Sequence, residues 1–114
     1  VPSTKSYTGN SNVDRLKTIA PLVKVAFEEA VKGNFLAALS LNGIIYSAAL
    51  GFDTSIALDA LSAGAVAAGL CGKGPAVTAV VSNDKIEEVK TALQRHEGEI
   101  MQAHLNQKKA RVVT

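Results

Sequence analysis

The sequence has few of the residues that mark a secreted, metal-binding or membrane-spanning protein. It contains one cysteine, Cys71, so no internal disulfide can form, and no cluster of metal-ligating residues surrounds it. No unbroken apolar run is long enough to span a bilayer, and no basic-then-apolar signal segment opens the chain. We therefore expect a cytoplasmic protein.

The sequence also lacks a strong excess of charge of either sign. Its 12 Lys and Arg residues and 10 Asp and Glu residues leave a net charge of +2, which is too small to indicate a nucleic-acid partner. The basic residues Lys108, Lys109 and Arg111 are interpreted as a solvated tail. We expect neither nucleic acid nor a membrane among the partners.

What the sequence does contain is typical of one folded domain. Hydrophobic residues make up 47% of the chain and charged residues 19%, and the length of 114 residues predicts a single domain over residues 1–114. The first residue is Val1 rather than methionine, which we interpret as a sign that a segment upstream has been removed.

The sequence pattern of the first half of the chain predicts helices. Apolar residues recur at three- and four-residue steps over 16–31, which predicts a helix that Pro21 interrupts and Gly33 ends. A second helix over 35–50 is apolar nearly all round, so we expect it to be buried. A third, short helix ends near Ala63.

The second half of the chain contains strand-length patterns. Residues 66–71 and 76–81 are apolar runs joined by a tight turn, which predicts a β-hairpin. A fourth helix begins at the cap Ser82-Asn83-Asp84 and ends at Gly98, and residues 99–106 alternate like a final strand. This order predicts an α+β fold, an antiparallel sheet with helices packed on one face. Residues 1–12 alternate weakly and are interpreted as a short edge strand or an incoming linker.

The most informative stretch is GLCGKGPAV, residues 69–77. It is not a Walker A loop, because Ala67 stands at the first glycine position and Gly74 follows the lysine. It is not a dinucleotide-binding loop either, because Val77 replaces the third glycine and no helix follows. Two interpretations stay open. The glycines form a tight hairpin turn, or exposed amides beside Lys73 hold an anion.

Other polar residues also admit two interpretations. Asn42 lies in an apolar helix, with Tyr46 one turn along; each is either a core residue or a ligand contact. Cys71 is expected to be a small buried hydrophobe rather than a reactive thiol. His96 and His104 are assigned surface roles, because no serine or carboxylate is spaced to form a catalytic or metal site with them. The sequence contains no activated nucleophile, so no catalytic residue is assigned.

The segment AGAVAAGLCGKGPAVTAVV, residues 63–81, resembles the third conserved motif of the GHMP kinases, whose pattern is similar to A-x-x-A-G-[AL]-S-G-[ST]-G-P-[ST]. Within that superfamily the chain looks most like the archaeal type of shikimate kinase, and residues 2–61 resemble the segment just upstream of the motif in those enzymes. The resemblance therefore covers nearly the whole chain, but only the C-terminal half of such an enzyme.

The resemblance implies a ferredoxin-like C-terminal domain whose partner is a larger N-terminal domain of the same kinase. ATP and the acceptor, shikimate, lie in the cleft between the two domains, and the main phosphate loop, the catalytic base and the Mg²⁺ ligands belong to the absent domain. The face that meets the absent domain is expected to be apolar, so the isolated chain is expected to self-associate and to be inactive.

The resemblance also implies roles for single residues. Gly69, Gly72, Gly74 and Pro75 match the motif, which borders the acceptor and the transferred phosphoryl group. Cys71 and Lys73 stand where the family usually has Ser or Thr, and we expect Lys73 to stabilise the developing charge. The alternatives are another GHMP kinase, of the homoserine or mevalonate type, and a stand-alone ferredoxin-like binding module.

Overall fold

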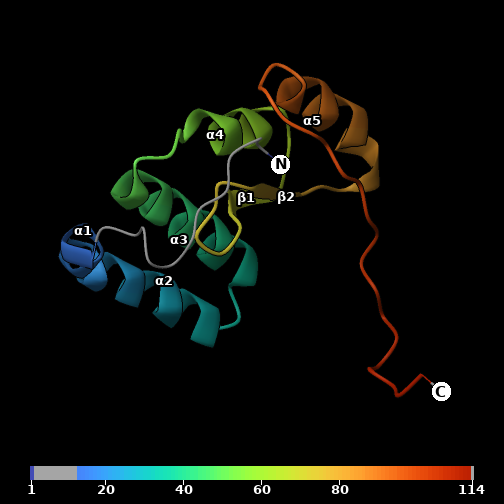
Figure 1. Cartoon of the computed structure of the whole chain (residues 1–114). Coiled ribbons are helices and arrows are strands. Elements are labelled where there is room, and N and C mark those ends of the chain that lie inside the picture. The colour runs from blue at the N-terminus through green and yellow to red at the C-terminus, as the bar shows by residue number, and fades with distance from the viewer. Residues whose placement is uncertain (2–12, 114) are drawn as a thin grey trace.

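The computed structural model describes Val1 and residues 13–113, and within these residues helices surround a short strand pair (Figure 1). The elements follow one another as α1 Val13–Thr18, α2 Ala20–Val31, α3 Phe35–Leu50, α4 Ser55–Ser62, β1 Ala67–Leu70, β2 Val77–Val80, the 3-10 helix η2 Asn83–Lys85, and α5 Ile86–Leu93. No helix in the described ranges has the length and apolar character needed to cross a membrane.

The breaks between the first helices follow local signals in the sequence. The predicted helix is divided into α1 and α2, and Pro21 lies in the first turn of α2, where its missing N–H costs no hydrogen bond. Gly33 and Gly51, at φ of 93° and 77°, end α2 and α3 in the left-handed region that glycine adopts at little cost. The predicted interruption at Pro21 and the end at Gly33 are confirmed.

Helix α3 is buried along one stripe rather than all round. Its buried residues are small, and Phe35 and Leu36 at its start are 69% and 45% exposed. The prediction of a fully buried helix was therefore wrong for the first turn, which projects beyond the strand pair (Figure 1). Phe27 and Val31 of α2 are exposed beside it, at 66% and 71%.

The strand pair is an antiparallel hairpin with Ala67 opposite Val80 and Leu70 opposite Val77. Both strands are shorter than predicted but lie within the predicted ranges. Helix α3 packs on β1, helix α4 packs on both strands, and α5 contributes Val89 to the core. This core is built mostly from small side chains, which allow close approach. The core cluster consists of Ala57, Ala60, Ala65, Ala68 and Val89. The predicted α+β fold, with helices packed on an antiparallel sheet, is confirmed.

Two predictions for the C-terminal end were wrong. Helix α5 ends at Leu93, before Gly98, and residues 99–106 form no strand. Residues 100–105 have no strand beside them among the described residues, and a strand is stable only when its backbone groups are paired. The predicted edge strand or linker over residues 1–12 lies outside the described residues, apart from Val1.

Candidate functional site

The glycine loop over 71–76 is a hydrogen-bonded turn between β1 and β2. The Cys71 amide donates to the Ala76 carbonyl at 2.8 Å, and the Gly74 amide donates to the Cys71 carbonyl at 2.9 Å. Gly72 and Gly74 have φ of 60° and 75°, a backbone conformation that is unfavourable for residues with a side chain. The hairpin turn predicted from the sequence is therefore present, and it includes a cis bond between Gly74 and Pro75.

Two glycines of the motif also allow close packing. A Cβ atom at Gly69 would lie 2.8 Å from the carbonyl oxygen of Leu39 in α3. A Cβ atom at Gly74 would lie 2.5 Å from Leu70 Cδ1 and 3.0 Å from Phe52 Cε2. These contacts hold β1 against α3 and the loop against Phe52, which follows α3. Close packing therefore explains why glycine occupies positions 69 and 74.

Lys73 is the residue of the loop that the fold leaves without a partner. Its ammonium nitrogen is buried and has no hydrogen-bond partner among the described residues. A buried, unpaired cation is unfavourable, and structures normally satisfy such groups. An anion that reached this nitrogen would supply the missing partner, so the loop has the chemistry of an anion-binding site.

Helix α3 lies alongside β1 and leads to the same loop. The Ala68 amide donates to Ser40 Oγ at 3.0 Å, and farther along both elements Gly43 meets Gly69. The two elements therefore run in the same direction.

Asn42 and Tyr46 keep their polar groups available. Both side chains are partly buried, and neither has a hydrogen bond within the part of the chain that the structure describes. Asn42 is adjacent to Gly43, the residue at the contact with β1. Both predicted residues therefore lie on α3, the helix that packs on β1.

The predictions for the cysteine and the two histidines have different outcomes. Cys71 is exposed, so its prediction as a buried hydrophobe was wrong. His104 is exposed, as predicted. His96 is not isolated, because its Nε2 atom lies 2.7 Å from Asp59 Oδ2. This pair joins the turn after α5 to α4, and no sequence spacing indicates it because the partners are 37 positions apart.

The electrostatics near the loop are otherwise those of helix capping. Asp53 follows Phe52, which contacts the loop, and its carboxylate accepts hydrogen bonds from the hydroxyl and the amide of Ser55. The Ser55 hydroxyl and then its amide hold the pKa of Asp53 below its usual range. Over the described ranges, no three His, Cys, Asp or Glu side chains are grouped as metal ligands would be.

Comparison with known proteins places this geometry in a family. The sequence model of the family described as "GHMP kinases C terminal" matches residues 26–99, which include α3, the glycine loop and α5. No solved structure matches the chain.

Curated relatives carry the name shikimate kinase. That of Methanothermobacter thermautotrophicus is 44% identical, over 99% of this chain and 39% of the relative. That of Methanobrevibacter smithii is 40% identical, over 93% and 37%, and that of Pyrococcus furiosus is 50% identical, over 68% and 28%. The chain therefore spans about two-fifths, or less, of the length of the relatives it matches.

Proposed function

The chain belongs to the GHMP kinases as one of their C-terminal domains, and from this premise we propose that it is the C-terminal domain of a shikimate kinase. The complete enzyme transfers the γ-phosphoryl group of ATP to the 3-hydroxyl of shikimate, on the route to chorismate and the aromatic amino acids. The observation that carries the proposal is the likeness to a shikimate kinase at 44% identity over 99% of this chain.

In this proposal the glycine loop forms the acceptor side of the cleft. Gly69, Gly72, Gly74 and Pro75 give the loop its shape, Cys71 lies exposed at its start, and Lys73 supplies a positive charge. The loop therefore approaches the transferred phosphoryl group with backbone amides and one ammonium, and catalysis rests on positioning and on stabilising negative charge. No residue of this chain is proposed as the catalytic base.

Asn42 and Tyr46 are proposed as contacts to the acceptor. An amide and a phenol donate and accept hydrogen bonds, which suits the hydroxyl and carboxylate groups of shikimate. Their place on α3, beside the strand that leads into the loop, supports this role.

The other domain of the kinase is the proposed partner of this chain. ATP and Mg²⁺ are held mainly by that domain, where Mg²⁺ neutralises the phosphate charge. Phe27 and Val31 of α2 and Phe35 and Leu36 of α3 are exposed apolar residues. Their exposure fits a face that the other domain covers, and it favours self-association of the isolated chain. The cytoplasmic location stays a prediction.

The acceptor is tested by the activity of the complete protein. ADP release with ATP and Mg²⁺ is measured with shikimate, homoserine and mevalonate as separate acceptors. We expect kcat/KM for shikimate to exceed that for the other two by at least about 10⁴, because a site built to pair polar groups rejects acceptors that leave them unpaired. Preference for homoserine or mevalonate would favour the other GHMP kinases. No turnover with any acceptor would favour a binding module.

A further inference from the structure

The loop that carries Lys73 is closed by its own hydrogen bonds. The amide of Cys71 donates to the carbonyl of Ala76, and the amide of Gly74 donates to the carbonyl of Cys71, so both bonds begin and end within residues 71–76. In the part of the chain that the structure describes, no hydrogen bond joins these residues to a helix. The bonds set the shape of the loop, and its position relative to the helices has to come from packing.

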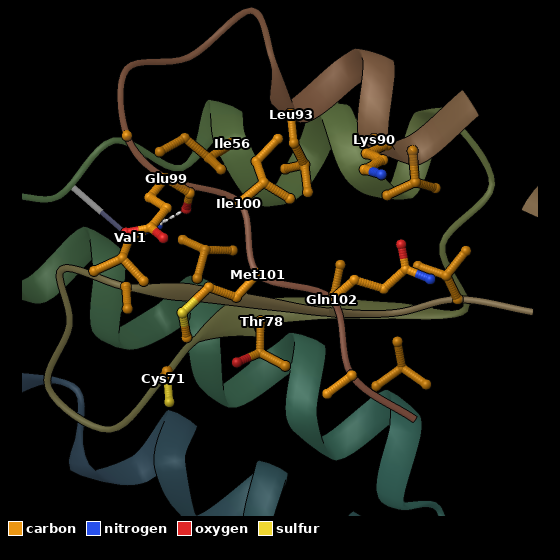
Figure 2. Close-up of a pocket in the computed structure, with 18 of the residues that line it drawn as sticks. Val1, Ile56, Cys71, Thr78, Lys90, Leu93, Glu99, Ile100, Met101 and Gln102 are labelled. Atoms are coloured by element: carbon orange, nitrogen blue, oxygen red, sulfur yellow. Dashed lines mark hydrogen bonds between the residues drawn. The ribbon is translucent and has the colours of Figure 1, made fainter. Parts of the chain in front are cut away.

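The two glycines beside Lys73 differ in what surrounds them. A Cβ atom at Gly72 would meet no atom within 4 Å beyond its chain neighbours, whereas a Cβ atom at Gly74 would lie 3.0 Å from Cε2 of Phe52. Cys71 is exposed as well, at the end of the strand pair (Figure 2). The loop is therefore open at Gly72 and packed at Gly74, so Lys73 is held from one side.

Phe52 reaches the loop from outside the hairpin. The other side chain beside Gly74 is that of Leu70, which is the last residue of β1 and so belongs to the hairpin itself. Phe52 instead lies in the link between α3 and α4, where its side chain is partly buried. Because glycine has no side chain, the ring of Phe52 lies close to the backbone of the loop, and the loop cannot move toward this ring without a clash.

The backbone around Phe52 is fixed on both sides. Its amide donates to the carbonyl of Ser47 at 2.9 Å, and Gly51 precedes it in the left-handed conformation, as in the Schellman motif that ends many helices. On the other side, the carboxylate of Asp53 accepts hydrogen bonds from the amide and the hydroxyl of Ser55 at 2.8 and 2.7 Å. A ring attached to a backbone constrained in this way can hold the loop in one position.

We propose that Phe52 is a positioning residue of the glycine loop, whose ring holds Gly74 in place and, through Gly74, the ammonium of Lys73. The inference rests on the proposed function, in which Lys73 approaches the transferred phosphoryl group. A displacement of about 1 Å can lower a rate by about 10²-fold, so loss of the ring is expected to lower kcat. Binding of the acceptor is expected to change little, because its proposed contacts, Asn42 and Tyr46, lie on α3.

The first test is steady-state kinetics of the complete kinase with Phe52→Ala and with Phe52→Leu, which keeps an apolar side chain in case the alanine variant does not fold. We expect kcat to fall by about 10-fold to 10²-fold for alanine and about fivefold for leucine, with KM for shikimate within about threefold. The control is Val89→Ala, which removes buried apolar volume from the core cluster. Because Val89 is not among the contacts of the loop, kcat of the control should stay within about twofold.

The second test repeats both Phe52 changes in a Lys73→Met background. A residue that acts through Lys73 loses its effect when that ammonium is absent, so the further fall in kcat is expected to be less than about twofold. An equal fall in both backgrounds would overturn the proposal, because Phe52 would then act on the fold as a whole. A rise in KM with kcat unchanged would also overturn it, because Phe52 would then contact the acceptor.

A third measurement does not depend on the reaction. Hydrogen exchange of the Gly74 amide is compared with that of the Ala68 amide, which is bonded to Ser40 of α3. In both Phe52 variants of the complete kinase, exchange at Gly74 is expected to rise by more than about fivefold relative to Ala68. If shikimate is not the acceptor, this ratio and the kcat values with the true acceptor still test Phe52, so failure of the proposed function is distinguishable. An unchanged exchange ratio would overturn the proposal.

Discussion

Lys73 is the residue that distinguishes this loop from a plain hairpin turn. Turn geometry accounts for Gly72 and Gly74, and close packing accounts for Gly69, whereas a buried ammonium without a partner contributes nothing favourable to the fold. A bound anion would supply the missing partner, and this is the role that we propose for Lys73. Only the structure distinguishes Lys73 from the glycines in this way, because the sequence of the motif does not show which residues are buried.

Replacing Lys73 by Met should separate activity from stability. Turnover of the complete kinase is expected to fall by about 10²-fold, because a charge that stabilises the transferred phosphoryl group is lost. The free energy of unfolding of this chain is expected to stay equal or to rise, because an unpaired buried charge is removed. Steady-state kinetics and urea unfolding measure the two quantities.

The matched control is Lys24→Met on α2, where the lysine side chain is 77% exposed and pairs only with Glu28. This change should leave both quantities within about 0.5 kcal/mol, or a rate factor near two, as exposed pairs contribute little. If Lys73→Met kept full turnover, or destabilised the chain strongly, the anion role of Lys73 would be wrong.

Single residues were predicted well where the signal is local. The turn glycines could be predicted because a tight turn between two apolar runs requires a backbone conformation that favours glycine. The exposure of Cys71 and the pairing of His96 with Asp59 depend on elements that are far apart in the sequence, so no local pattern indicated them.

At the scale of elements, the contact between α3 and β1 positions the site. A Cβ atom at Gly43 would lie 2.5 Å from the Leu70 nitrogen and closer still to the Cα atom of Gly69. The helix can therefore approach the strand only because both positions are glycine. This contact fixes α3, the helix that carries Asn42 and Tyr46, against the strand that leads into the glycine loop.

Replacing Gly43 by Ala tests that contact through the sign of its effect. Alanine in place of glycine within a helix normally stabilises it by about 1 kcal/mol. Here the clash with β1 should reverse the sign and lower the free energy of unfolding by about 1–3 kcal/mol, as overpacking does. Denaturant unfolding measures the difference.

The control for helix propensity is Ala48→Gly at an exposed position of the same helix, which should cost about 1 kcal/mol. A stabilised Gly43→Ala variant would mean that α3 does not pack closely on β1.

Elements were predicted well where their ends carry their own signals. Pro21, Gly33 and the hairpin turn are such signals, and the elements beside them were located nearly correctly. The alternation over 99–106 predicted a strand, but a strand requires a neighbour. Among the residues that the structure describes, only Glu99 of that segment is bonded to a facing chain, at Val1. A sequence pattern describes what a segment is suited to, and its pairing depends on the rest of the fold.

At the scale of the whole molecule, the chain is a folded α+β domain that leaves a groove and several large apolar side chains exposed. The groove of about 760 Å³ is lined by β2, α5 and the segment that follows α5 (Figure 2), and Phe27 of α2 and Phe35 of α3 are exposed. The family and the fold class followed from the glycine motif together with the order of elements. Acceptor choice did not follow, because most of the groups that contact ATP and the acceptor are proposed to lie in the other domain.

The central claim is that this chain is one part of a kinase whose site is completed by another domain. The most direct measurement is ADP release with ATP, Mg²⁺ and shikimate, first by this chain alone and then after mixing with the separately produced N-terminal part, with association verified by light scattering. The account predicts no turnover by the chain alone and shikimate-dependent turnover by the mixture. Turnover by the chain alone, or none from parts that associate, would contradict it.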